Sequence, residues 1–173
     1  EPDQIRFSYN RFGKPFIDDH NVSIRFNVSH SRDIALIAVT SGKEVGIDIE
    51  FVDDDLDVLT TAKGIFSQTE TSMLEKLSPD LRTRAFFRGW TRKEAYLKAL
   101  GKGFSGESSQ FPVSILMNEQ KFVFITNDRN QSRKWSLMSL PSGQNYSSAL
   151  VVEGEIETTR NRQLPIKWEN ENR

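Results

Sequence analysis

Two acidic residues, Asp48 and Glu50, lie two positions apart in a run that alternates between apolar and other side chains from residue 45 to residue 51. This alternation predicts a β-strand, and residues two apart on a strand point to the same side. We expect both carboxylates on one face, opposite an apolar face that is the buried one. Two carboxylates this close repel each other unless a cation lies between them. A simple solvated strand face would hold the same pair without any function.

A third carboxylate, Glu94, falls on the apolar side of a long predicted helix. At about 100° per residue, Glu94 shares an arc with Trp90 and Leu97, whereas Arg92 lies on the opposite side. A buried carboxylate without a partner costs several kcal/mol. Lys98, one turn further along, offers an ion pair within the helix, but such a pair contributes only a few tenths of a kcal/mol. A metal ion or a phosphate-bearing ligand explains the placement better.

These three carboxylates indicate a site for a hard divalent cation. Asp48, Glu50 and Glu94 offer only oxygen ligands, and the chain contains no cysteine and two histidines. Mg²⁺ prefers oxygen ligands, keeps some of its water and is often completed by substrate phosphates. We therefore predict a Mg²⁺ site and phosphate chemistry. Lys98 would contact a phosphate and neutralise charge that develops on a leaving oxygen.

Two shorter motifs are weaker signals. His30 follows a predicted strand and lies between two serines, and Lys14 lies in a Gly-Lys-Pro turn. A single histidine at the end of a strand is more often structural or simply exposed, and a lysine in a turn is a weak signal when taken alone.

Taken together, the motifs resemble those of the longer, Sfp-like 4′-phosphopantetheinyl transferases. They occur in the order typical of that family: Gly13–Pro15, Asn27–Ser31, Gly46–Glu50 and Trp90–Lys98. The separation of Glu50 and Glu94 along the chain also suits the family. The resemblance covers roughly residues 5–105 and is weak in the C-terminal strands.

The resemblance implies a catalytic centre. Asp48, Glu50 and Glu94 would hold Mg²⁺ together with the pyrophosphate of coenzyme A, and Lys98 would contact the phosphates. Glu94 would also help, directly or through water, to deprotonate the attacking serine of a carrier protein. Glu94 and Lys98 are thus the implied catalytic residues.

The resemblance also implies a binding site for coenzyme A, the substrate. Lys14, Ser29 and His30 would bind its nucleotide end, with Lys14 and His30 near the 3′-phosphate. The implied reaction moves the 4′-phosphopantetheine group to a serine of an acyl or peptidyl carrier protein and releases adenosine 3′,5′-bisphosphate.

The order of the expected elements favours an α+β fold with largely antiparallel sheet. A strand is expected before the turn at 13–15. A capping box at Ser67–Glu70 and the pair Ser78–Pro79 predict helix starts, and the second helix should end at Gly101. Further strands are predicted at 24–29, 34–40, 45–51, 111–117, 121–126, 135–140 and 146–153.

The family fold is a pseudo-dimer of two similar α+β halves with the ligand between them. Residues 1–42 would be the remainder of the N-terminal half, 43–156 the C-terminal half with the metal site, and 157–173 a polar tail. Long-type members carry further sequence before the Gly-Lys-Pro turn. We therefore expect a long-type enzyme that lacks its N-terminal segment and is monomeric when complete. Without that segment, apolar side chains on Phe26, Val28 and the 34–39 run should be exposed.

Composition narrows the alternatives. The net charge of −1 gives no indication of nucleic-acid binding. No apolar run approaches the roughly 20 residues that a membrane helix needs, no signal peptide is visible, and the absence of cysteine fits a reducing compartment, so we expect a cytoplasmic protein.

A Mg²⁺-dependent phosphodiesterase or nuclease would use similar carboxylates but would need a basic groove. A non-catalytic carrier- or nucleotide-binding module of the same fold is the other alternative.

Overall fold

The computed structural model describes residues 4–19, 21–102, 121–128 and 131–163. In these ranges the chain forms eight strands and three helices. The strand predicted at 111–117 lies outside the described residues. In chain order the elements are β1 (Phe7–Tyr9), β2 (Pro15–Ile17), β3 (Ile24–Ser31), β4 (Ile34–Ser41), β5 (Val45–Phe51), α1 (Val58–Ala62), α2 (Gln68–Glu75), α3 (Pro79–Leu100), β6 (Lys121–Asp128), β7 (Gln131–Ser139) and β8 (Tyr146–Glu153).

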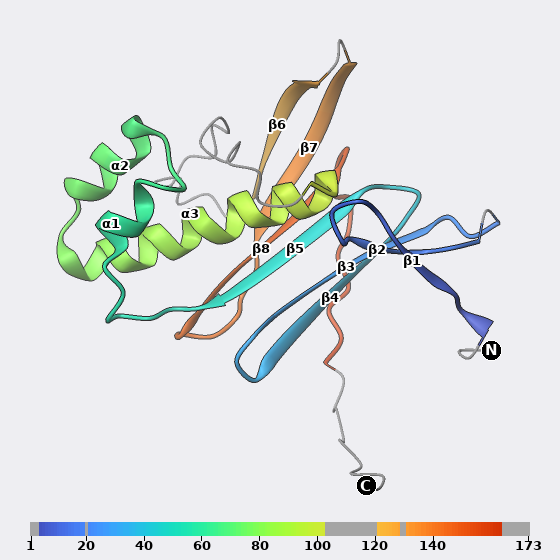
Figure 1. Ribbon diagram of the computed structural model, residues 1–173, viewed down its shortest axis with the longest axis horizontal. Coiled ribbons are helices and arrows are strands. Elements are labelled where there is room, and N and C mark those ends of the chain that lie inside the picture. Colours follow the sequence, from blue (N-terminus) through green and yellow to red (C-terminus); the bar gives the residue numbers. More distant parts are fainter. Residues whose placement is uncertain (1–3, 20, 103–120, 129–130, 164–173) are drawn as a thin grey trace, which may run out of the picture.

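The largest unit of the fold is an antiparallel sheet of four strands in the order β5-β8-β7-β6. Helix α3 lies across one face of this sheet, and α1 and α2 pack beside the N-terminal half of α3 (Figure 1). The predicted α+β fold with largely antiparallel sheet and a long helix is therefore confirmed. None of the described helices is long and apolar enough to span a membrane.

Local sequence determines where the helices begin and end. Ser67 and Glu70 form the predicted capping box, because each side chain accepts a hydrogen bond from the peptide N–H of the other residue. Helix α3 begins at Pro79 and ends before Gly101, whose φ of 63° lies in the left-handed region that glycine adopts without strain. Ser78 makes no side-chain capping bond. The predicted helix boundaries are thus confirmed without a Ser78 cap.

Strand β5 has its predicted bounds, but the expectation that only its apolar face is buried is wrong. Helix α3 covers the opposite face, so that Asp48 is only 1% exposed. The close packing depends on Gly46, which shares that face with Asp48. A Cβ atom on Gly46 would lie 2.0 Å from the carbonyl oxygen of Ala95 and 2.3 Å from the peptide nitrogen of Ala99. The missing side chain therefore lets α3 lie directly against β5.

Helix α3 is buried around more of its circumference than the apolar arc predicts. Arg92, predicted to face away from the core, is 1% exposed, and its guanidinium donates hydrogen bonds to the Ser139 hydroxyl on β7. Lys93 is also 1% exposed and forms an ion pair of 2.9 Å with Glu70 of α2. Because the sheet and the short helices both contact α3, neither long side chain reaches solvent.

The hairpin formed by β3 and β4 lies beside β5 but does not join the four-stranded sheet (Figure 1). Strand β3 contacts β5 through side chains, because three alternate residues of β3 accept hydrogen bonds from peptide N–H groups of β5. We call these three contacts the side-chain ladder. They join Asn27 to Ile47 at 2.8 Å, Ser29 to Ile49 at 3.3 Å and Ser31 to Phe51 at 3.0 Å.

The side-chain ladder reverses the usual burial of an alternating strand. Asn27 and Ser29 are buried, whereas Val28 between them is 41% exposed. On β4, Ile37 and Val39 are each 62% exposed. The predicted exposure of apolar side chains on this hairpin is confirmed at these three positions.

The first hairpin, β1 and β2, occupies the region where one strand was predicted, and it packs on the second hairpin. Phe7 of β1 makes an edge-to-face contact with Phe26 of β3, with 5.6 Å between the ring centroids. Phe26 is therefore half-buried, an exception to the predicted exposure. In the turn between β1 and β2, the Asn10 amide donates a hydrogen bond of 2.8 Å to the carbonyl of Gly101. This bond ties the turn to the C-terminal end of α3.

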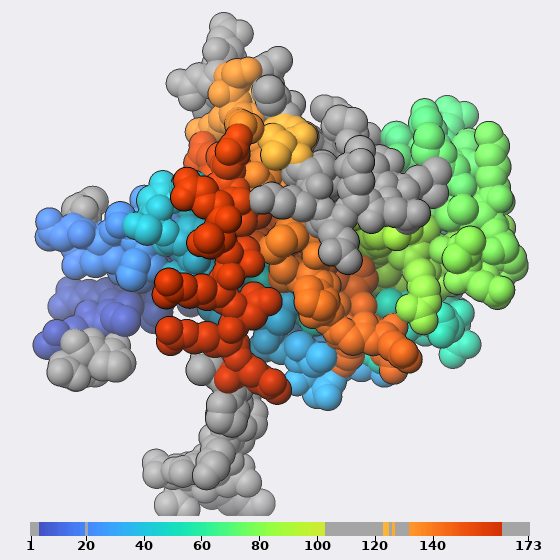
Figure 2. Space-filling view, turned by 180° about the vertical axis from the view of Figure 1, so that it is seen from behind, coloured from blue at the N-terminus to red at the C-terminus, as the bar shows by residue number. Residues whose placement is uncertain are grey.

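The segment after β8 runs across the face of the molecule seen in Figure 2. Ile156 in this segment packs against the buried cluster that contains Ala38, Val45 and Ile47. A groove of about 400 Å³ is lined on one side by β4 and on the other by residues 155–161. Residues 157–163 are exposed, and the rest of the predicted polar tail lies outside the described residues.

We expect Gly46→Ala to destabilise the protein strongly, because its new Cβ would overlap backbone atoms of α3, which would have to shift. The free energy of unfolding, measured with urea, should fall by about 3 kcal/mol or more. Gly64→Ala is a matched control, since a Cβ there would meet only the Thr61 carbonyl at an ordinary 3.7 Å. Equal stability of the two variants would refute the close approach of α3 to β5.

Candidate active site

The side chains of Asp48, Lys98 and Ser29 meet where β5, α3 and β3 come together. The Lys98 ammonium lies 2.6 Å from Asp48 Oδ1 and donates a second hydrogen bond of 2.9 Å to the Ser29 hydroxyl. The Ser29 hydroxyl in turn donates to Asp48 Oδ1 at 2.9 Å. Three elements that are distant in the sequence thus contribute one compact polar cluster.

Asp48 keeps one carboxylate oxygen unused. Its Oδ2 is buried and has no hydrogen-bond partner in the described part of the chain. Burial raises the pKa of Asp48, although the Lys98 ammonium and the Ser29 hydroxyl act in the opposite direction. A buried acceptor without a partner is costly. A cation bound at Oδ2 would remove that cost.

Glu50 extends the acidic cluster along β5. The Ser31 hydroxyl donates a hydrogen bond of 3.2 Å to its Oε2. Burial and the negative charge of Asp48 raise the pKa of Glu50, whereas Ser31, Lys98 and His30 lower it. The charge of Asp48 therefore disfavours ionisation of Glu50, as their spacing on one strand face implies.

Glu94 faces the same cluster from α3. Burial, followed by the negative charge of Asp48, raises the pKa of Glu94 to about 7, with Lys98 opposing and Glu50 adding to the increase. Lys98 forms its ion pair with Asp48 on β5 and not within the helix with Glu94. The simple helix pair considered from the sequence is therefore not the arrangement that the structure has.

The three carboxylates fit a hard divalent cation in chemistry, although they are not preassembled around one point. Within the described ranges, no three His, Cys, Asp or Glu side chains lie close enough to hold a metal ion. The negative charge of Asp48 nevertheless raises the pKa of both Glu50 and Glu94, and Asp48 Oδ2 has an open lone pair. Oxygen donors of this kind are those that Mg²⁺ prefers. The donor set thus fits the cation.

The predicted nucleotide ligands do not all lie together. Ser29 belongs to the cluster, whereas His30 is exposed on β3 and its neighbours Ser29 and Ser31 point toward β5. Lys14 lies at the C-terminal end of α3. Its ammonium contacts three acceptors: Glu44 Oε2 at 3.2 Å, the Val45 carbonyl at 3.0 Å and the Ala99 carbonyl at 3.2 Å.

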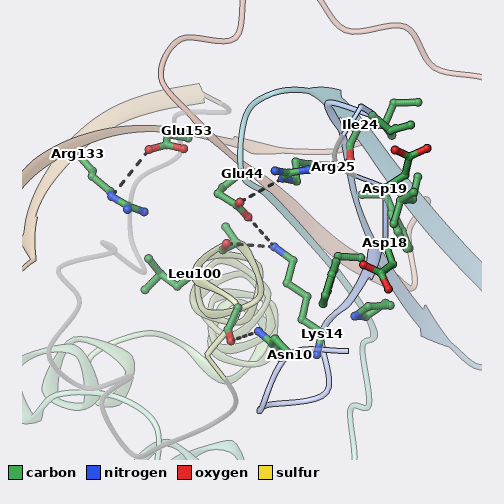
Figure 3. A pocket seen from close by; sticks show the side chains of 17 residues that line it. Asn10, Lys14, Asp18, Asp19, Ile24, Arg25, Glu44, Leu100, Arg133 and Glu153 are labelled. Carbon is green, nitrogen blue, oxygen red and sulfur yellow. Dashed lines mark hydrogen bonds and ion pairs between the residues drawn. The ribbon is translucent and has the colours of Figure 1, made fainter. Parts of the chain in front are cut away.

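A hollow of about 610 Å³ opens beside Lys14 and does not include the three carboxylates (Figure 3). Five of its charged side chains lie in ion pairs: Glu44 contacts both Lys14 and Arg25, and Arg133 lies 3.9 Å from Glu153. Asp18 and Asp19 also line the hollow. The candidate site at Asp48 therefore lies outside this hollow.

Sequence reasoning left Asn27 and Ser31 without a role, although both belong to a motif that it singled out. Their alternation with Ser29 was the available signal, since residues two apart on a strand share a face. The side-chain ladder places these residues between two strands, where they accept hydrogen bonds from peptide N–H groups of β5.

The raised pKa of Glu94 predicts a dependence of stability on pH. Between 4.5, the ordinary value, and about 7 the folded state binds more protons than the unfolded state, so stability should fall as pH rises through this window. In EDTA, the wild type should lose on the order of 1 kcal/mol more than Glu94→Gln between about pH 5 and pH 8, after allowance for solvent screening. If the free energy of unfolding changed with pH by the same amount in the wild type and in Glu94→Gln, the assigned environment of Glu94 would be wrong.

Comparison with known proteins identifies the family. Residues 44–151 match the family model of the 4′-phosphopantetheinyl transferase superfamily. This match covers β5, the three helices, β6, β7 and β8 as far as residue 151. The acidic residues and Lys98 all lie inside it.

Several relatives are similar over most of the chain. The 4′-phosphopantetheinyl transferase HetI of Nostoc sp. is 33% identical over 156 residues, which are 89% of this chain and 63% of HetI. The protein slr0495 of Synechocystis sp. is 34% identical over 95% of this chain and 69% of its own length. The transferase Sfp of Bacillus subtilis is 37% identical over 73% of this chain and 54% of Sfp. The chain therefore belongs to the 4′-phosphopantetheinyl transferase superfamily.

Proposed function

We propose that the protein transfers the 4′-phosphopantetheine group of coenzyme A to a serine of an acyl or peptidyl carrier protein in a Mg²⁺-dependent reaction. Adenosine 3′,5′-bisphosphate would be the second product. Membership of the superfamily supports this reaction class. The observation that carries the proposal is the buried contact of Asp48, Lys98 and Ser29 beside Glu94, whose pKa lies near neutrality.

Each residue of the cluster has a chemical role in this proposal. Asp48, Glu50 and Glu94 would hold Mg²⁺, which when bound would supply positive charge to neutralise the pyrophosphate. The Lys98 side chain is 30% exposed. Its ammonium can therefore contact a phosphate that enters from solvent and stabilise charge on the leaving oxygen. Glu94 can accept the proton of the serine, because a base with a pKa near 7 is suited to proton transfer at neutral pH.

Coenzyme A would be bound through its nucleotide end by Ser29, His30 and Lys14. His30 is exposed next to Ser29 and can therefore contact a phosphate without rearrangement. Lys14 would have to exchange at least one of its three acceptors for a phosphate oxygen. We also propose that residues 1–42 are the remainder of an N-terminal half, that residues 43–156 are the C-terminal half, and that residues 157–173 are a tail. The protein would be cytoplasmic and, when complete, monomeric.

The transfer can be tested with an apo carrier protein, coenzyme A and Mg²⁺. Intact mass should increase by one phosphopantetheine group per carrier. Asp48→Ala and Glu94→Gln should each lower the rate by at least about a hundredfold, because each removes a carboxylate that the reaction needs. Glu75→Gln, an exposed change on α2, is the matched control and should retain the wild-type rate. Near-normal transfer by Glu94→Gln would exclude Glu94 as an essential base or metal ligand.

The nucleotide role of His30 predicts discrimination between two ligands. His30→Ala should weaken binding of coenzyme A about tenfold or more, since a hydrogen bond to a charged group contributes about 1.5–3 kcal/mol. Binding of 3′-dephospho-coenzyme A should change little, because that ligand lacks the phosphate. Calorimetry with both ligands checks the prediction, and equal losses would remove His30 from the 3′-phosphate site.

A further inference from the structure

The outer edge of β5 is satisfied in an unusual way. The peptide N–H groups of alternate residues on this edge point away from β8, and in an ordinary sheet the carbonyls of a neighbouring strand would accept them. Here the acceptors are side chains of β3, and each acceptor precedes its donor by 20 residues. The constant offset means that β3 runs parallel to β5. Side-chain oxygens occupy the space that a backbone ladder would fill.

The two serines of the side-chain ladder each make a second contact. Ser29 accepts from the Ile49 N–H and donates its proton to Asp48, at 2.9 Å. Ser31 accepts from the Phe51 N–H at 3.0 Å and donates to Glu50 at 3.2 Å. In both cases the carboxylate belongs to the residue just before the N–H donor. A hydroxyl can do this because it both accepts and donates, whereas a carbonyl oxygen only accepts.

The remaining contact of the side-chain ladder has a different side chain. Asn27 accepts from the Ile47 N–H, and the residue just before Ile47 is Gly46, which has no side chain. An amide therefore occurs where there is no carboxylate to orient, and hydroxyls occur where there is one. This correspondence indicates that the serines orient the carboxylates and also accept hydrogen bonds from the edge of β5.

Glu50 depends on this contact more than Asp48 does. Asp48 also bonds to Lys98, whereas Ser31 is the hydrogen-bond partner of Glu50 within the described part of the chain. Glu50 is half-buried and has a longer side chain, so it has more rotamers to lose on ordering. The Ser31 bond holds its Oε2 and leaves Oε1 for another ligand.

We propose that Ser31 is a positioning residue for Glu50, a role that rests on the proposed function of Glu50 as a metal ligand. Its hydroxyl links the Glu50 carboxylate to the Phe51 peptide N–H and so fixes the carboxylate relative to Asp48 on the same strand. Ser31 itself contacts neither substrate nor metal.

Binding of Mn²⁺ alone, followed by the electron paramagnetic resonance signal of the free ion, tests this role without coenzyme A or turnover. Mn²⁺ accepts the same oxygen ligands as Mg²⁺. Ser31→Ala should weaken Mn²⁺ binding about five- to tenfold, and Ser31→Thr, which keeps the hydroxyl, should restore it. Asn27→Ala is the structural control: it also removes a contact of the side-chain ladder, so it should lower the melting temperature but leave Mn²⁺ affinity within about twofold.

A second variant keeps the test decisive if Ser31→Ala does not fold. Ser31→Cys preserves the size of the side chain but has only a weak donor, and it should show the same loss of Mn²⁺ affinity. Wild-type affinity in Ser31→Ala or Ser31→Cys would overturn the positioning role, as would an equal loss in Asn27→Ala. The two proposals can fail separately. If the wild type modified no carrier protein but the Ser31 variants still lost Mn²⁺ affinity, the proposed transfer would be wrong and the positioning role of Ser31 would be supported.

Discussion

The rest of the structure depends on one edge of β5, which in the described part of the chain has no neighbouring strand to accept its peptide N–H groups through backbone carbonyls. Ile47 and Ile49 on this edge are buried, so their peptide N–H groups need protein acceptors. Asn27, Ser29 and Ser31 meet that need and thereby fix the position of the β3–β4 hairpin on the four-stranded sheet. A backbone ladder would satisfy the same edge but could not donate protons to carboxylates. The same side-chain contacts therefore hold the β3–β4 hairpin on the sheet and orient the carboxylates of Asp48 and Glu50.

Helix α3 adds the second constraint, because Gly46 lets it lie directly on the face of β5 that carries the carboxylates. This close packing brings Lys98 to Asp48 and removes water from Glu94, whose pKa rises to about 7 for that reason. Burial opposes ionisation of all three carboxylates, and Lys98 offsets only part of that effect. The fold therefore maintains a cluster of acidic groups that binds protons more readily than a solvated cluster would.

Local patterns predicted the elements well. The alternation of β5, the capping box at Ser67 and the end of α3 at Gly101 depend on neighbouring residues, and all three are confirmed. Tertiary partners were not predictable in this way. Periodicity tells which side chains share a face but not what covers that face, which is why the burial of Asp48 and Arg92 was missed. The inward polar face of β3 was missed for the same reason, since its partner is the edge of another strand.

The same distinction between local patterns and tertiary partners applies to the candidate site. The strand and helix patterns selected Asp48 and Lys98, which come from different elements and are in contact in the structure. The role of Lys14 came from the resemblance alone, and its surroundings are those of a structural residue. Its ammonium bonds to the Ala99 carbonyl at the C-terminal end of α3, where the helix dipole favours a positive charge, and to Glu44. A phosphate would have to compete with both groups. Lys14 would therefore contribute to nucleotide binding only if the charge of the ligand outweighed contacts that already anchor the β1–β2 turn to α3.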